Sequence, residues 1–141
     1  MLARPYGVGK LANDEAIALR HEYVGTEHYL LAIARMRGTV AAQVLKGYGV
    51  TPDEVQAAIR RIVNTVPAKR LGRLPLTLRA KKAIGLSIEE ARLMGSNTVS
   101  TEHLLLALLR VDDGVAIQAL REMIIDITGI RRAIIAGLEQ I

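Results

Sequence analysis

The sequence contains no cysteine, no phenylalanine and no tryptophan, and its four tyrosines are its only aromatic residues. Without cysteine the chain can form no disulfide, no thiolate metal site and no cysteine nucleophile. So few aromatic faces also argue against a stacking platform for single-stranded nucleic acid. The longest strongly apolar run, residues 104–109, is far shorter than the ~20 residues that span a bilayer. No secretory signal is visible, and we expect no membrane partner.

What the sequence does contain favours a folded domain. The 141 residues suit one domain or two small halves. Half of them are hydrophobic and 23% are charged, so the chain can bury a core and is not disordered by composition.

The positive charge is concentrated in one segment. Residues 55–88 contain no Asp or Glu and eight Lys or Arg, which gives this segment +8 against a net +5 for the whole chain and leaves −3 for the rest. Such a cluster suits an anionic partner or nucleic acid. It is more often typical of a solvated linker and helix face.

The chain is an internal duplication. Residues 14–63 align without a gap with residues 89–138 at an offset of 75, and sixteen of the fifty pairs are identical. Stacked copies of one unit usually bury a shared core. We divide the chain into a first repeat (residues 1–63), a linker (64–75) and a second repeat (76–141).

Each repeat is predicted to form four helices. In the second, apolar residues recur every three or four positions from Ala80 to Met94, and Gly95 ends that helix. The next helices are expected over about 101–110, over 115–122, and from about Ile127 onward with Asp126 as its cap. The fold class is therefore all-α, with eight helices in two related halves.

The first repeat departs from this pattern at its start. Pro5, Gly7 and Gly9 stand where the second repeat has good helix formers. Proline in a helix interior costs ~3 kcal/mol and each glycine up to ~1 kcal/mol. The first helix is therefore predicted to begin near Gly9 or Lys10, with residues 1–8 irregular.

Thr-Glu-His occurs once in each repeat, at residues 26–28 and 101–103. Threonine suits an N-cap, and Glu in a first turn complements the helix dipole. Adjacent helical residues point about 100° apart, so Glu and His would not form an acid–base couple. The sequence contains no HExxH spacing, and His21 adds no metal ligand at a useful spacing. We expect no enzyme activity, no metal and no cofactor.

A different site is predicted at the start of the second repeat. Thr77 is an ordinary N-cap, but free N–H groups, a hydroxyl and Arg79 at one helix start also suit an anion. If this start lies beside that of the next helix, Glu102 adds a carboxylate for a cation. A ligand carrying both charges would suit Thr77, Arg79 and Glu102.

The doubled pattern resembles the N-terminal repeat domain of the Clp/Hsp100 chaperones, closest to the ClpC branch. The resemblance rests on Glu-Glu-Ala-Arg at 89–92, on Thr-Glu-His-Leu-Leu at 101–105, on Gly-Val-Ala-Ile-Gln at 114–118 and on the opening at 74–82. It covers about residues 8–141. It implies a cytoplasmic, all-α module with pseudo-twofold symmetry that receives substrate and adaptor proteins for AAA+ unfoldases and the ClpP protease.

The resemblance also implies a ligand, the degradation mark phosphoarginine. In the family the Glu of Thr-Glu-His meets the guanidinium, and the Thr and Arg that open each repeat meet the phosphate. The matching residues are Thr77, Arg79 and Glu102, with a weaker site at Arg4 and Glu27 because Leu2 replaces the threonine. The family's usual Phe before that Thr is replaced by Leu76 and by Met1.

Two alternatives stay open at this point. The chain stops where ATPase modules would begin, so it is either a domain of an unfoldase or a free-standing decoy that sequesters the same ligands. A helical nucleic-acid binder using the basic segment 55–88 is the alternative from another class.

Overall fold

A computed structural model describes residues 5–139, and in that range the chain forms eight α-helices and no strand. The predicted fold class is confirmed. In chain order the helices are α1 (Pro5–Ala18), α2 (Thr26–Arg35), α3 (Val40–Gly47), α4 (Pro52–Ile62), α5 (Leu78–Leu93), α6 (Thr101–Leu108), α7 (Val115–Glu122) and α8 (Ile127–Glu139).

Polar caps fix several helix starts at the expected residues. The Thr77 hydroxyl accepts from the Ala80 N–H at 3.0 Å, and Asp126 accepts from the Gly129 N–H at 2.9 Å. Both bonds satisfy an N–H that has no partner inside its helix. Helix α5 ends as predicted, because Gly95 takes a φ of +72° that glycine adopts without steric cost.

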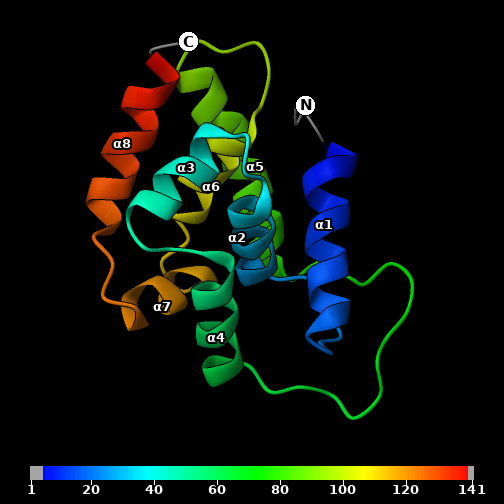
Figure 1. The fold of residues 1–141 in the computed structure, drawn as a ribbon. Coiled ribbons are helices and arrows are strands. Elements are labelled where there is room, and N and C mark those ends of the chain that lie inside the picture. The colour runs from blue at the N-terminus through cyan, green and yellow to red at the C-terminus, as the bar shows by residue number, and fades with distance from the viewer. Residues whose placement is uncertain (1–4, 140–141) are drawn as a thin grey trace.

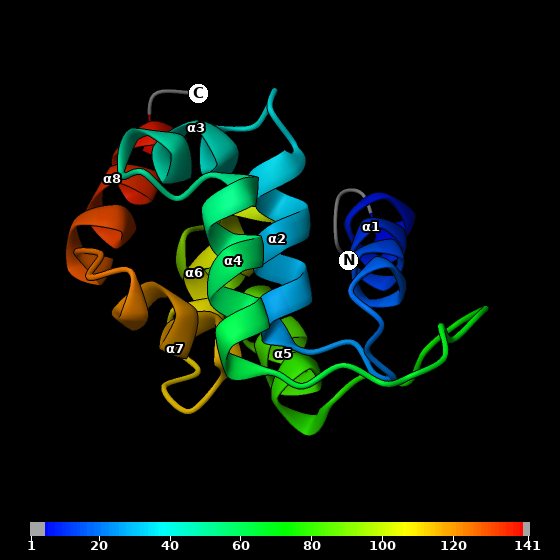
Figure 2. The same cartoon turned by 60° about the horizontal axis from the view of Figure 1, so that its bottom comes forward.

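The prediction for the first helix is wrong. Helix α1 begins at Pro5 rather than near Gly9 or Lys10. Proline at a first helical position loses nothing, since the N–H that it lacks would have no partner there. The cost of two glycines is offset by packing, because α1 lies along α2 and buries Val8, Ala12 and Ala16 (Figure 2).

The two repeats are interlocked rather than placed side by side. Helix α2 of the first repeat packs on α6 and α7 of the second, α4 packs on α7, and α3 packs on α6 and α8. Figure 1 shows α2 in the middle of the molecule, between α1 on one side and α3, α6 and α7 on the other. Helices α2 and α6 are buried along nearly their whole lengths, and they carry Leu30, Leu31, Leu105 and Leu106 into one shared core.

The chain between α4 and α5 contains no helix and loops outward past α1 before α5 begins (Figure 2). It is tied back at several points. The Val66 N–H donates to the Arg20 carbonyl at 2.8 Å, and Asn13 bonds both the Leu74 N–H and the Gly72 carbonyl. Of the eight cations in segment 55–88, Arg61, Arg70 and Arg79 form ion pairs with Glu122, Glu22 and Asp113.

No helix in the described residues combines the length and the apolar character needed to cross a bilayer.

Candidate functional site

The starts of α2 and α5 are held together by a short parallel backbone bridge between Val24 and Leu76. The Val24 N–H donates to the Pro75 carbonyl at 2.8 Å, and the Thr77 N–H donates to the Val24 carbonyl at 2.9 Å. The end of the linker is therefore pinned directly before the Thr-Glu-His of the first repeat. This bridge decides which residues share a site.

A pocket of about 260 Å³ opens where these two helix starts meet. Its lining combines one carboxylate, one guanidinium and two hydroxyls of threonine, and it consists of Tyr23, Thr26, Glu27, Thr77, Arg79 and Val115. The structure thus brings the predicted Thr77 and Arg79 together with Glu27, which the sequence had assigned to the other site.

Glu27 is a buried acid with an unused oxygen. Its side chain is only 1% exposed, and Oε2 has no hydrogen-bond partner among the described residues. Burial raises the pKa of Glu27 to about 7, partly opposed by a hydrogen bond from its own backbone N–H. An unpaired buried carboxylate is costly, so the site is poised to accept a cationic donor.

Gly25 allows this carboxylate to fold back onto the backbone. A Cβ at position 25 would overlap Glu27 Oε1 and lie 2.9 Å from Cδ. The corresponding residue of the second repeat is Ser100. The first repeat therefore holds its acid in a conformation that a side chain at position 25 would block.

Arg79 and Thr77 form the positive side of the pocket. Arg79 is exposed, and its guanidinium pairs with Asp113 at 3.0 Å. The hydrogen bond from Arg79 lowers the pKa of the Asp113 carboxyl, while the same bond raises the pKa of Arg79. This pair is exposed on both sides and is weakly held, so Arg79 is free to turn toward an anion.

Glu102, the third predicted site residue, is not among the lining residues of this pocket. Its Oε2 accepts from the Ala41 N–H at 2.9 Å and from the Thr101 hydroxyl at 3.2 Å. Glu102 therefore caps the start of α3. Arg4, the predicted partner of Glu27, lies outside the described residues, as do Leu2 and Met1.

The Thr-Glu-His motif caps helices in a way the sequence did not predict. The N-caps are Gly25 and Ser100, one residue earlier than the expected Thr26 and Thr101. The Thr26 hydroxyl accepts from the Ala116 N–H of α7 at 3.1 Å, so it caps a helix of the other repeat. Thr26 caps α7 instead of its own helix because the repeats interlock and α2 packs on α7.

The histidines of the motif complete these caps. His28 Nδ1 accepts from the Gly25 N–H, and His103 Nδ1 accepts from the Ser100 N–H, both at 2.9 Å. His28 Nε2 then donates to His21 Nδ1 at 2.7 Å. Burial and the neighbouring His21 lower the pKa of His28 to about 3. The histidine pair is neutral and structural, and it contributes no charge to the pocket.

Sequence reasoning missed Tyr23, Gly25 and the role of Glu27 beside Thr77. Only one signal was available for them: the duplication itself, in which Gly25 corresponds to Ser100 and the two Thr-Glu-His segments have unequal surroundings. Whether a helix start pairs within its own repeat or across repeats cannot be read from a duplication.

Comparison with known sequences gives consistent matches. Residues 10–139 match the family described as the Clp repeat N-terminal domain. The chain is 39% identical over 125 residues to a ClpA homolog, described as an ATP-binding subunit of the ATP-dependent Clp protease, from Guillardia theta, covering 89% of this chain and 15% of that protein. It is 38% identical over 127 residues to the ClpC ATP-binding subunit from Staphylococcus epidermidis, covering 90% and 15%. The chain thus spans about 15% of the length of these relatives.

Solved structures share the fold. The N-terminal domain of the chaperone ClpD from Arabidopsis thaliana superposes with a TM-score of 0.77 at 23% identity, covering 96% of this chain and 95% of that one. The Hsp104 N-terminal domain from Candida albicans gives a TM-score of 0.74 at 14% identity, covering 96% and 89%.

Proposed function

Because the chain belongs to the family of Clp repeat N-terminal domains, we propose that it is a protein-binding module that receives substrate and adaptor proteins for Clp proteolysis, and that its pocket recognises phosphoarginine. The observation that carries the proposal is the buried Glu27 carboxylate, whose Oε2 has no hydrogen-bond partner among the described residues, in one pocket with Thr77 and Arg79. The module binds its ligands and performs no reaction on them.

The chemistry of phosphoarginine suits the two sides of this pocket. Its guanidinium group donates to Glu27 Oε2, which has no other partner among the described residues. Its phosphate lies against Arg79 and the free N–H groups at the start of α5, beside the Thr77 hydroxyl. Charge-assisted hydrogen bonds of this kind are about twice as strong as neutral ones. Unmodified arginine would satisfy only the acidic side, so the phosphate provides the selectivity.

The proposed set of ligand-binding residues is therefore Thr77, Arg79 and Glu27. Glu102 is assigned to the cap of α3 because its Oε2 accepts from the Ala41 N–H and from the Thr101 hydroxyl.

Calorimetric titration of the protein with phosphoarginine tests the proposal. We expect heat of binding with the unmodified protein and none with Glu27→Gln, which keeps the shape of the side chain but cannot become ionised. Glu102→Gln is the matched control and should retain binding. Separate titrations with arginine and with inorganic phosphate should give much weaker binding.

Two results would overturn the assignment. Absence of heat with the unmodified protein would remove phosphoarginine as the ligand. Binding that survives Glu27→Gln but is lost in Glu102→Gln would restore the pairing expected from the sequence.

A further inference from the structure

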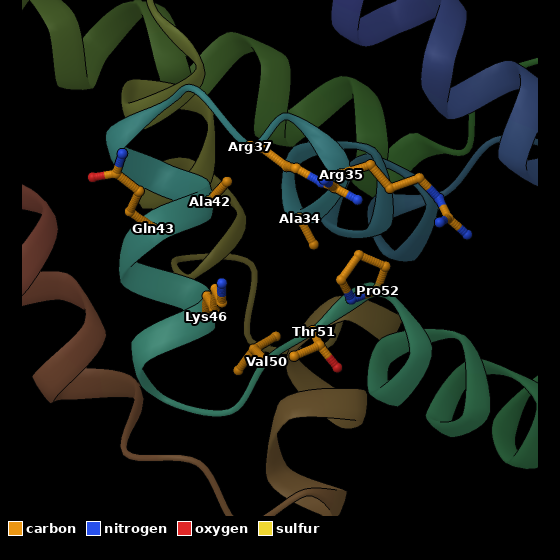
Figure 3. A pocket seen from close by; sticks show the side chains of 9 residues that line it. All are labelled: Ala34, Arg35, Arg37, Ala42, Gln43, Lys46, Val50, Thr51 and Pro52. Atoms are coloured by element: carbon orange, nitrogen blue, oxygen red, sulfur yellow. The ribbon is translucent and has the colours of Figure 1, made fainter.

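A second and larger pocket lies at the opposite end of α2. It has a volume of about 750 Å³ and is enclosed by the end of α2, by α3 and by the start of α4. Figure 3 shows Arg37 at the upper edge of this hollow with Ala34 below it, and Lys46 on α3 with Val50 below it. Because α2 has ten residues that each rise 1.5 Å, this pocket is about 15 Å from the Glu27 pocket.

The lining is basic at the rim and apolar at the floor. Arg35, Arg37 and Lys46 line the pocket, and none of the lining residues in the described part of the chain is acidic. Arg35 is neutralised by an ion pair with Glu15. Arg37 and Lys46 are exposed and have no ion-pair partner among the described residues, while Ala34, Ala42 and Val50 are buried beneath them. The pocket therefore presents two unpaired positive charges above an apolar floor.

The duplication provides an internal comparison for this pocket. In the second repeat Asp112 replaces Arg37, Asp126 replaces Thr51, and Arg121 replaces Lys46. Arg121 there is engaged, donating to the Asp112 carbonyl at 3.4 Å. The same backbone thus carries a charge-balanced surface in one repeat and a net positive one in the other. The positive charge is a property of these side chains and is not imposed by the fold.

We infer that this pocket docks an acidic peptide segment of a partner protein, one in which carboxylate side chains alternate with apolar ones. The carboxylates pair with Arg37 and Lys46, and an apolar side chain enters between them onto Ala34, Ala42 and Val50. A volume of this size lies within the usual range for ligand pockets. The inference concerns a different surface from the Glu27 site and does not depend on it.

Charge and shape favour a peptide over nucleic acid here. Duplex binding relies on a row of phosphate contacts, often six to ten of them, and this pocket offers two unpaired cations. Stacking of single-stranded bases needs aromatic faces, and the lining includes none. An apolar floor gives no advantage to a phosphate backbone but stabilises a leucine-like side chain.

Fluorescence anisotropy with the full chain tests this inference. The probe is a short fluorescein-labelled peptide of alternating glutamate and leucine, and its control replaces each glutamate with glutamine. We expect binding of the first peptide, little binding of the second, and a loss of about tenfold or more in affinity for Arg37→Asp/Lys46→Glu. Both substitutions are at exposed positions, and circular dichroism will establish that the variant is folded.

Arg60→Asp/Lys69→Glu is the matched control, because it makes the same change in net charge at exposed positions remote from the pocket. It should leave peptide affinity within about twofold. An equal loss in both variants would show that net charge alone is sensed and would overturn the proposal. Equal binding of both peptides would overturn it too, as would a short DNA duplex that binds more tightly and displaces the acidic peptide.

Discussion

The Glu27 carboxylate lies folded against Gly25, so closely that a side chain at position 25 would overlap it. This contact links a helix cap to the proposed ligand site, because Gly25 is the N-cap of α2 and Glu27 lines the pocket. In the second repeat, Ser100 precedes an acid that reaches a backbone N–H of another helix instead.

Gly25→Ala should force Glu27 out of its position. We expect a loss of about 1–3 kcal/mol in the free energy of unfolding from overpacking, together with a loss of phosphoarginine binding. Urea denaturation and calorimetry measure the two effects. Gly85→Ala is the control: Gly85 is exposed within α5 with open space around it, so alanine should stabilise by about 0.5–1 kcal/mol. A fully stable, fully binding Gly25→Ala variant would contradict the packing described above.

Thr26→Val should destabilise a helix in the other repeat. The valine has nearly the same shape but cannot accept the Ala116 N–H, which is then left buried without its partner. The expected cost is about 1–3 kcal/mol, and hydrogen exchange should show the loss of protection in α7. Exchange that increases in α2 alone would contradict capping across the repeats.

Glu90→Gln should be far more damaging than Glu89→Gln. Glu90 is 4% exposed, and its Oε1 accepts from Arg131 at 3.1 Å and from Arg110 at 3.4 Å. Removing its charge weakens two bonds to charged donors, at a cost of about 1–3 kcal/mol. Glu89 pairs with Arg110 at 3.5 Å with much of its side chain in solvent, and its loss should cost less than about 1 kcal/mol. Thermal denaturation of the two variants side by side measures the difference.

The raised pKa of Glu27 predicts a specific dependence of stability on pH. The folded state holds this proton up to about pH 7, while the unfolded chain releases it near pH 4.5. Between these values the folded state binds more protons, so this group's contribution to stability falls as pH rises and is constant above pH 7. The stability of Glu27→Gln relative to the unmodified protein should therefore grow by roughly 3 kcal/mol from pH 4 to pH 8.

The comparison with Glu27→Gln is needed because His28 acts in the opposite direction. Its pKa is lowered, so its contribution is lost as pH falls from its unfolded value of 6.5 toward about 3. This histidine is present in both proteins, and its effect cancels in the difference. A difference that does not change with pH would show that folding does not shift the pKa of Glu27.

The local structure was largely predictable from the sequence. The placing of Glu27 in one pocket with Thr77 and Arg79 was not. Helix α7 and the caps at Thr77 and Asp126 follow from patterns within a few residues, where propensity and capping act. The start of α1 was mispredicted because propensity penalised Gly7 and Gly9, and tertiary packing on α2 outweighed it.

For the proposed site, the sequence could predict only those residues that lie close together in the chain. Thr77 and Arg79 are recognisable from one helix start. Glu27, which lines the same pocket, lies fifty residues earlier in the sequence, and the Val24–Leu76 bridge brings the two segments together. The sequence alone assigned Glu102 to this helix start, and only the long-range arrangement of the backbone shows Glu27 in the same pocket.

The interlocking of the repeats has a consequence for how the chain is made. As the first repeat leaves the ribosome, α2, α3 and α4 can contact one another and α1, but their partners α6, α7 and α8 in the second repeat are still to be synthesised. Their apolar faces stay open until residues near Ile134 emerge, which is most of the length of the chain. Two independent four-helix halves would have closed the first core at half that length. The nascent chain is thus exposed to aggregation for longer than its size alone would suggest.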